Sequence, residues 1–395
     1  MMLTHKICLN PTVKQEIALI KAAGTARYTW NWALAECERY YRETGRMANL
    51  SEMKIFWNKC KPAWTKESPK DANQQPFMDL QKAYRRFFKH LVGKPKFKCK
   101  GRSKDSFYIS NDKFSVKGKT IRLSKIGHIS MREAVRFVGK IISARVSRTA
   151  GKWYVSIVID VQTESKPGTE IIGIDLGLKT FAALSTGEKF EAPKPLKKSL
   201  DKLQRLSRSH SRKQKGSANR KKATAKLSKH HARIASIRKD FLHKLSTQIV
   251  SRAKIVSVED LSVKKMQKLY GRAVADVGMY KFRRQLTYKC QKSDVGCVIV
   301  NRWYPSSQLC SQCGQRQKVT LVNREYKCLR CGLKMDRDHN AAINICTAGF
   351  AEINACGHEG SDGKTIIAVK PSWLKQELNR CQMDAFNNKI RKQDS

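Results

Sequence analysis

Three acidic residues stand where a side chain could take part in catalysis. Asp175 and Glu259 each follow an apolar run and are predicted to end a buried strand, and Asp338 precedes the sequence His-Asn-Ala-Ala-Ile. One such acid alone often marks only the point where a strand leaves the core. Three together can hold two Mg²⁺ or Mn²⁺ ions about 4 Å apart, as hydrolysis of a phosphodiester at neutral pH requires. Asp336 is the competing candidate for the third position.

Four of the thirteen cysteines form two Cys-x-x-Cys pairs, each followed directly by glycine: Cys310 with Cys313, and Cys328 with Cys331. The stretch between the pairs is long enough for a small hairpin that returns the chain. Four thiolates complete a tetrahedron around Zn²⁺ and leave no open position, so the spacing predicts a structural zinc site. The alternative is four thiols without a metal.

The charge of the chain predicts a polyanionic partner. Eighty Lys and Arg residues against 32 Asp and Glu leave a formal net charge of +48. Nucleic acid fits this excess, because each cation that neutralises a phosphate releases condensed counterions. Composition alone is also consistent with a ribosome-associated or merely basic protein.

The excess of Lys and Arg over Asp and Glu is largest between residues 194 and 239, where helices are predicted and Asp201 is nearly the only acid. We expect the apolar stripe of these helices to pack and their basic face to bind backbone phosphates, although a charge run can also be a solvated face. The cations selected as nucleic-acid-binding residues are Arg205, Lys213, Arg220 and Arg233.

No stretch approaches the roughly 20 apolar residues that cross a bilayer, and the amino terminus lacks the continuous apolar segment of a signal peptide. No membrane partner is therefore expected. The expected location is the cytoplasm of a bacterium or archaeon, in association with the nucleoid.

Periodicity divides the chain into modules and predicts a multidomain protein of α+β and α/β class. A strand opens the chain, helices follow, alternating strands form a small β-barrel into which the helices are inserted, and strands then alternate with helices. The predicted modules are the first barrel strand (1–12), a helical insertion (13–92), the rest of the barrel (93–166), an α/β domain with basic helices (167–307), a zinc finger or ribbon (308–332), the return to the α/β domain (333–350) and a mobile carboxy-terminal tail (351–395).

Several motifs resemble those of a known family. Residues 173–179 (Gly-Ile-Asp-Leu-Gly-Leu-Lys) resemble the first motif of RuvC-like nucleases, residues 258–261 (Val-Glu-Asp-Leu) the second, and residues 338–342 the third, Asp-x-Asn-Ala-Ala. With the cysteine pairs between the second and third motifs, the chain resembles the transposon-encoded TnpB proteins, relatives of type V CRISPR effector nucleases. The resemblance extends from the basic linker at 95–98 to Asn340.

The resemblance implies an RNase H-like (RuvC) nuclease domain interrupted by the zinc ribbon. It implies Asp175, Glu259 and Asp338 as magnesium ligands, with Asp338 preferred over Asp336 because it stands in the matching place before Asn340. It also implies an RNA-guided DNA endonuclease, with a guide RNA from the transposon end and double-stranded target DNA that carries a short adjacent motif. The amino-terminal helices and barrel would grip these partners.

Two other functions remain open from the sequence. An RNA-guided DNA-binding repressor would bind without cutting, but such relatives tend to lose one of the three acids. A cut-and-paste transposase also uses three acids, in the order Asp, Asp, Glu, whereas the order here is Asp, Glu, Asp. A transposase should bind the ends of its own element without RNA, and an RNA-guided protein should copurify with RNA.

Overall fold

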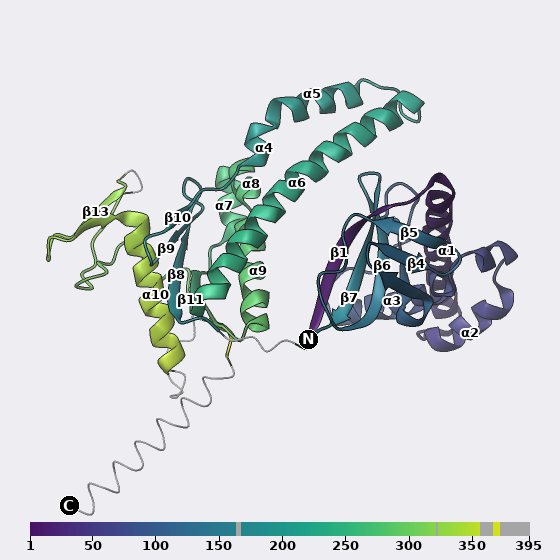
Figure 1. The fold of residues 1–395 in the computed structure, drawn as a ribbon, viewed down its shortest axis with the longest axis horizontal. Coiled ribbons are helices and arrows are strands. Elements are labelled where there is room, and N and C mark those ends of the chain that lie inside the picture. Colours follow the sequence, from purple (N-terminus) through teal and green to yellow (C-terminus); the bar gives the residue numbers. More distant parts are fainter. Residues whose placement is uncertain (163–166, 321–322, 356–365, 372–395) are drawn as a thin grey trace, which may run out of the picture. The chain divides into compact units, whose positions relative to one another are not determined.

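The chain folds into two compact units, Met1–Thr163 and Glu164–Ser395, each described here by itself (Figure 1). The computed structural model describes residues 1–162, 167–320, 323–355 and 366–371. The division falls close to the predicted boundary between residues 166 and 167. Together the units form a mixed α/β multidomain protein, in agreement with the predicted class.

The amino-terminal unit contains a seven-stranded antiparallel sheet in the order β2-β6-β7-β1-β5-β4-β3. Every second residue of β1 from His5 to Leu9 is buried, as its alternating pattern predicted. This strand links two parts of the sheet, because Met2 to Cys8 pair with β7 whereas Leu9 and Asn10 pair with β5. The strands are β1 (Met2–Asn10), β2 (Ser106–Ser110), β3 (Phe114–Lys117), β4 (Thr120–Leu123), β5 (Gly127–Met131), β6 (Lys140–Thr149) and β7 (Lys152–Asp160).

Three α-helices and one short 3-10 helix (Ala63–Glu67) lie between β1 and β2 in the chain; the α-helices are α1 (Val13–Thr44), α2 (Leu50–Cys60) and α3 (Lys70–Phe88). A capping box of Thr12 and Gln15 starts α1, and Gly45, with φ of 67°, ends it. The helices share a core that includes Trp30 and Trp57. Both of these rings are buried, whereas Trp64 is 48% exposed.

The second unit is built on a six-stranded sheet in the order β10-β9-β8-β11-β12-β15. Strands β8, β11 and β12 are parallel, so their carboxyl ends meet at one edge of the sheet, where Asp175 and Glu259 lie. Strands β9 and β15 are antiparallel to their neighbours. The strands are β8 (Glu170–Leu176), β9 (Ala182–Leu184), β10 (Lys189–Phe190), β11 (Ala253–Glu259), β12 (Gly296–Val300) and β15 (Ile366–Val369).

Helices cover both faces of this sheet (Figure 1). Leu245 of α6 and Phe282 of α9 pack with Val256 on one face, and Ile345 of α10 packs with Val298 on the other. None of the described helices is both long and apolar enough to span a bilayer. The helices are α4 (Pro195–Lys198), α5 (Leu200–Ser211), α6 (Ala218–Arg252), α7 (Val263–Tyr270), α8 (Arg272–Val277), α9 (Met279–Lys292) and α10 (Arg337–Ala355).

Two predicted module ends differ from the structure. The zinc finger was expected to end at residue 332, but β13 (Glu325–Lys327) pairs with β14 (Lys334–Asp336), so its hairpin reaches Asp336. Residues 308–336 are called the zinc module below. The mobile tail expected from 351 is wrong for the described residues, because α10 runs to Ala355 and β15 pairs with β12. The apolar run 366–369 supplies this edge strand, and the polar segments around it hid the signal. Residues 356–365 and 372–395 lie outside the described part.

Helix α10 crosses the sheet at a distance that only glycine permits. A Cβ added at Gly173 in β8 would lie 2.1 Å from the Ala342 carbonyl oxygen, and one added at Gly349 in α10 would lie 1.9 Å from Ser257 Oγ. The backbone of Ala342 cannot move aside as a flexible side chain can, and the Cβ atom of Ser257, 2.5 Å from the added Cβ at Gly349, is fixed to its own backbone. The two glycines therefore set the spacing between α10 and the parallel strands.

Replacing Gly173 with Ala should lower the free energy of unfolding by about 1–3 kcal/mol, because the new methyl group overpacks the contact between β8 and α10. Denaturant unfolding measures this change. Gly93→Ala is the matched control, since its added Cβ meets nothing within 4 Å. Equal stability of the two variants would contradict the close contact.

Candidate functional site

The three predicted acids line one cavity of about 930 Å³ in the second unit. Asp175 lies near the end of β8, Glu259 ends β11, and Asp338 lies in the first turn of α10. The parallel pairing of β8 and β11 brings the first two together, and the crossing of α10 over the sheet brings the third to the same edge. The structure thus gathers side chains that are far apart in the sequence.

The electrostatics of this cavity disfavour negative charge in the protein alone. Burial, together with the charge of Asp338, raises the pKa of Asp175 to about 7. Burial, together with the charges of Asp175 and Asp260, raises the pKa of Glu259 to about 7. Carboxylates that repel one another in a partly buried site are typical of functional sites that await a cation or substrate.

Two arginines balance the charge of Asp338. Arg324 Nη1 lies 3.3 Å from Asp338 Oδ2, and Arg337 Nη2 lies 3.2 Å from Oδ1. Both arginines also line the cavity. Among the described residues, only the four zinc-module cysteines bring three or more potential ligand atoms within 4.8 Å of one another. The acids are therefore spread around the cavity and do not converge on a single point.

Asp336 has a different role from Asp338. Its Oδ1 accepts a hydrogen bond from the His339 backbone N–H at 3.0 Å, which caps the start of α10. Its Oδ2 pairs with Lys189 Nζ at 2.7 Å. Burial alone would raise the pKa of Asp336, but the hydrogen bonds from Lys189 and the His339 backbone outweigh it and lower the pKa. These contacts occupy both oxygens in holding α10 to the strands.

Asp260, which follows Glu259 in the chain, also has both carboxylate oxygens engaged. Asp260 pairs with Arg283 through one oxygen and with Arg302 through the other. These hydrogen bonds outweigh the effect of burial and lower the pKa of Asp260. Its charge is therefore balanced, whereas the carboxylate of Glu259 faces the cavity.

The four cysteines form the predicted cluster. The Sγ atoms of Cys310 and Cys331 are 3.6 Å apart, as are those of Cys313 and Cys328. A tetrahedron with Zn–S bonds of about 2.3 Å has edges of about 3.8 Å, so the sulfur positions fit Zn²⁺. The Cys331 N–H donates to Cys328 Sγ, which favours the thiolate and lowers the pKa of Cys328 to about 6.

Two asparagines that sequence reasoning missed join the zinc module to α10. Asn340 is fully buried, accepts from the Ser311 N–H at 2.9 Å and donates to the Leu309 carbonyl at 2.7 Å. Asn344, one turn later, donates to the carbonyls of Ser306 and Leu309 at 2.8 Å. Their spacing of four on a helix is the signal that could have revealed a shared face. The first cysteine pair is thereby fixed beside the turn that carries Asp338.

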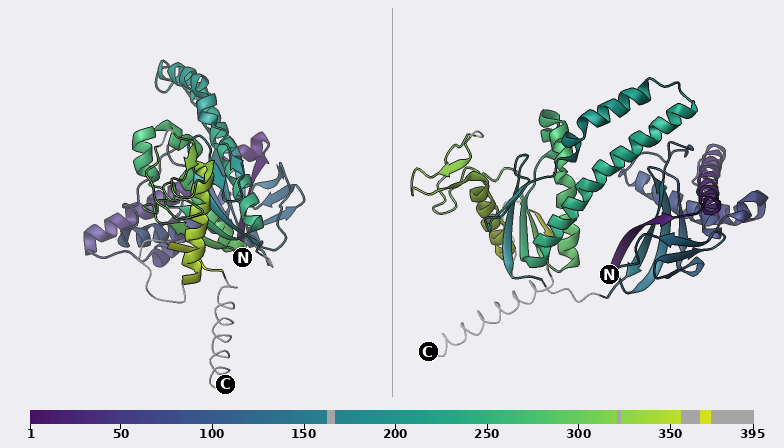
Figure 2. Two further views of the ribbon diagram at one scale, coloured as in Figure 1. Left: turned by 90° about the vertical axis from the view of Figure 1, so that its left-hand side faces the viewer. Right: turned by 45° about the horizontal axis from the view of Figure 1, so that its top comes forward.

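The predicted nucleic-acid-binding cations lie on the hairpin of α5 and α6, which extends beyond the sheet (Figure 2). Arg205 and Arg233 are exposed. Lys213 and Arg220 are only partly exposed, and Arg220 Nη1 donates to the Lys213 carbonyl at 2.6 Å. Arg220 therefore closes the turn between the helices. No ion pair with a carboxylate engages the Lys and Arg residues from 194 to 233 in this fully described segment.

Three family profiles match the chain. One described as "Probable transposase" (OrfB_IS605) covers residues 154–269, and a Cas12f1-like TNB domain covers residues 280–345. The first range holds Asp175 and Glu259, and the second holds the four cysteines and Asp338. A third profile, a helix-turn-helix domain, covers residues 1–46, where the structure has strand β1 and the single helix α1.

Relatives extend the similarity over almost the whole chain. A protein of Streptomyces pristinaespiralis, named as an RNA-guided DNA endonuclease, is 36% identical over 94% of this chain and 94% of its own length. The chain belongs to the TnpB family. The protein InsQ of Escherichia coli K12, also named as an RNA-guided DNA endonuclease, is 33% identical over 91% of this TnpB-family chain and 95% of its own length.

A solved structure supports the fold of this TnpB-family chain. The protein of a Cas12f1–sgRNA–target DNA complex aligns with a TM-score of 0.53 at 17% identity, over 84% of this chain and 83% of that chain. The likeness concerns the fold. The family membership rests on the relatives at 33% and 36% identity.

Substitutions of Asp175 and of Asp336 should change the free energy of unfolding in opposite directions when Mg²⁺ is withheld. The raised pKa of Asp175 means that the folded state is penalised as pH rises from about 4, and fully above about 7. Asp175→Asn should therefore raise the free energy of unfolding at pH 8 by on the order of 1 kcal/mol. Asp336→Ala should lower it by about 1 kcal/mol, because the cap of α10 is lost.

Unfolding at pH 8 and at pH 5, with Mg²⁺ withheld and zinc retained, measures both changes. The difference in the free energy of unfolding between Asp175→Asn and wild type should be smaller at pH 5, where the wild-type Asp175 carboxyl group is largely protonated. An Asp175→Asn variant that is less stable than wild type at pH 8 would contradict the electrostatic account of the cavity.

Proposed function

We propose that this protein is a guide-RNA-directed DNA endonuclease whose Asp175, Glu259 and Asp338 hold two Mg²⁺ or Mn²⁺ ions. The observation that carries the proposal is their placement around one cavity, with the pKa of Asp175 and Glu259 raised to about 7 in the protein alone. A divalent cation would favour the ionised form of each carboxyl group. Hard oxygen ligands of this kind suit Mg²⁺ and Mn²⁺.

The spread of the acids is compatible with two ions. A pair of ions about 4 Å apart needs a wider set of ligands than a single ion does. Asp175 and Glu259 lie on adjacent strands, and Asp338 approaches from α10. When bound, such ions polarise the scissile phosphate, activate a water molecule and stabilise the leaving oxygen.

Side chains of the chain supply the remaining functions. Arg324 and Arg337 flank Asp338 in the protein alone, and both face the cavity. Once the charge of Asp338 is compensated otherwise, these guanidinium groups can hold the non-bridging oxygens of a phosphate, for which their planar donors are suited. Arg324 belongs to the zinc module, so this module would contribute to substrate binding as well as to stability.

The zinc module would also position the third acid. The cysteine cluster fits Zn²⁺, and Asn340 connects its first cysteine pair to the helix of Asp338. Loss of zinc would release the backbone around Leu309 and Ser311 from a fixed geometry. We therefore expect a structural role of the zinc in the nuclease activity.

The topology of both units supports the domain assignments that we propose. In the second unit, strands β10, β9, β8, β11 and β12 lie in the order 3-2-1-4-5, with the last two parallel to the first, as in an RNase H-like (RuvC) domain. In the first unit, β1 bends between two antiparallel groups of strands, which favours a barrel with α1 to α3 inserted. This barrel and its helices would hold the guide RNA and the short motif beside the target.

The partners follow from the family and the charge. The relatives are named as RNA-guided DNA endonucleases, and the Cas12f1 structure contains sgRNA and target DNA. A net charge of +48 provides attraction for both nucleic acids. A guide from the transposon end and a double-stranded target would place the protein at the nucleoid of its bacterial or archaeal host.

Binding without cleavage is the second candidate function, and no observation on the cavity favours it, because all three acids are present and face the same space. A transposase mechanism would use the acids in another order. The cleavage assay below separates these possibilities.

Asp175→Ala, Glu259→Ala and Asp338→Ala should each reduce Mg²⁺-dependent cleavage by on the order of 1,000-fold or more, because the contribution of a metal ion is several kcal/mol. Each variant should still bind RNA and target DNA, since affinity arises from many dispersed cations. The assay is cleavage of a plasmid that carries a target matched to the copurified RNA, beside a gel-shift measurement. Asp336→Ala is the control and should keep substantial activity. Full cutting by Asp175→Ala would contradict the proposal.

Neutralising Arg205 and Arg233 together, as Arg205→Gln with Arg233→Gln, should weaken nucleic-acid binding and reduce the salt slope by about one unit per lost phosphate contact. Lys244→Gln on the same α6 helix is the matched control, because Lys244 already pairs with Asp240 at 2.8 Å. Affinity measured at several salt concentrations gives the slopes. An unchanged slope in the double variant would mean that the face is only solvated.

A further inference from the structure

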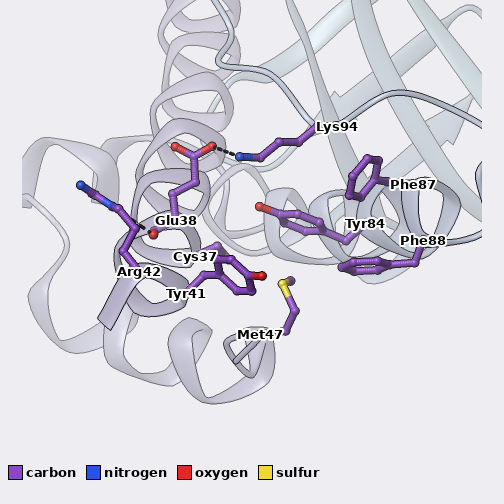
Figure 3. Close-up of a pocket in the computed structure, with 9 residues that line it drawn as sticks. All are labelled: Cys37, Glu38, Tyr41, Arg42, Met47, Tyr84, Phe87, Phe88 and Lys94. Atoms are coloured by element: carbon purple, nitrogen blue, oxygen red, sulfur yellow. Dashed lines mark hydrogen bonds and ion pairs between the residues drawn. The ribbon is translucent and has the colours of Figure 1, made fainter. Parts of the chain in front are cut away.

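A cavity that the proposed nuclease site does not use lies between the carboxyl ends of α1 and α3 in the amino-terminal unit. Its volume is about 390 Å³, within the range of pockets that bind small organic groups. Tyr41 and Arg42 of α1, Tyr84 and Phe88 of α3, and Lys94 line it. Figure 3 shows these side chains around one hollow.

Aromatic rings form much of the wall of this pocket. The rings of Tyr84 and Phe88 stack with centroids 6.1 Å apart and an interplanar angle of 20°, and Phe87 lies 5.3 Å from Phe88. Tyr84 is buried, but Tyr41 and Phe88 are each 55% exposed, so the core does not require them. Exposed rings that border a hollow offer a surface for stacking a flat ligand.

A basic segment begins at the rim of the pocket and is fixed against α1. Trp30 Nε1 donates to the Lys96 carbonyl at 3.1 Å, and Asn31 exchanges two hydrogen bonds with the backbone of Lys98 at 2.8 and 2.9 Å. The ammonium group of Lys98 lies 3.7 Å from the centroid of the Trp30 ring. The exposed cations of the segment are Lys94, Lys96, Lys100, Arg102 and Lys104.

The charged residues in and beside the pocket favour a ligand that carries phosphate groups. Glu38 is the one acid that lines the pocket, and Lys94 pairs with it at 3.0 Å. The neighbouring segment therefore presents a row of cations beside an aromatic hollow. A flat ring attached to phosphates complements both features, whereas an apolar protein surface would leave the cations without partners.

We infer that this pocket takes an unpaired nucleobase of the guide RNA, with adjacent phosphates on the exposed cations from Lys96 to Lys104. The inference rests on the proposed function, which supplies the RNA. Folded RNA presents unpaired bases in loops and bulges that can stack on aromatic side chains, whereas a duplex DNA target offers unpaired bases only once the guide has opened it.

The experiment uses the RNA that copurifies with the full chain, after sequencing, transcription and end-labelling. The double variant Tyr41→Ala with Phe88→Ala should bind this RNA on the order of tenfold more weakly, as expected for a lost stacking contact. Chemical probing should show an unpaired base that is protected in the wild-type complex and reactive in the double variant. The melting temperature should be unchanged, because both side chains are half exposed.

Two controls distinguish stacking from general disturbance. Tyr41→Phe with Phe88→Tyr retains both rings and should retain affinity and protection. Phe56→Ala removes a ring that is 57% exposed on α2, outside the pocket, and should leave both unchanged. Light scattering of each variant without RNA measures self-association.

The inference is overturned if RNA copurifies but the alanine variant has wild-type affinity and the same protected bases. It is also overturned if the wild type self-associates and the variant does not, with RNA affinity unchanged, because the pocket is then a contact between copies of the chain. A wild-type preparation that contains no RNA would contradict the proposed function and, with it, this inference.

Discussion

Helix α10 packs against the parallel strands so closely that β8 and α10 each need a glycine at the contact. A side chain at Gly173 or Gly349 would meet atoms of the opposite element at about 2 Å. This contact fixes the position of the first turn of α10 relative to the ends of β8 and β11. Asp338, which lies in that turn, reaches the cavity of Asp175 and Glu259 only because of this packing.

The same helix connects the site to the zinc module. Asn340 and Asn344 hold the backbone before and within the first cysteine pair, and Asp336 caps the helix while it pairs with Lys189 of β10. The start of α10 is therefore fixed from two sides. Such support keeps functional groups in a productive geometry, as sites built on rigid elements require. Through these contacts the cysteine cluster can influence the position of Asp338.

The arrangement of three acids around one cavity creates electrostatic repulsion between their carboxylates. Three carboxylates face one space, and the chain reduces the repulsion by protonation of Asp175 and Glu259 near neutral pH and by the two arginines at Asp338. The site therefore lowers the stability of the fold, as clusters of like charge at functional sites commonly do. Asp260 and Asp336, whose oxygens are engaged by cations or backbone, show the more common outcome for acids at strand ends.

The sequence predicted the elements that carry a strong local pattern. The alternation in β1, the apolar strands before Asp175 and Glu259, and the cysteine spacing all correspond to described structure. Long-range features could not be predicted. The arginines of the cavity, the role of Arg220 in a turn and the pairing of β15 with β12 depend on contacts between segments far apart or on a short apolar run among polar residues. The choice of Asp338 over Asp336 came from a resemblance and stays a prediction; the structure adds that Asp336 caps α10, whereas Asp338 lines the cavity.

The central claim is that Asp175, Glu259 and Asp338 bind divalent ions in this cavity. Anomalous scattering from a crystal of the full chain grown with Mn²⁺ tests it directly. The account predicts manganese peaks within coordination distance of all three carboxylates, with the Arg324 guanidinium displaced from Asp338. Manganese bound at Asp336, or bound elsewhere with the cavity of the three acids left empty, would contradict it.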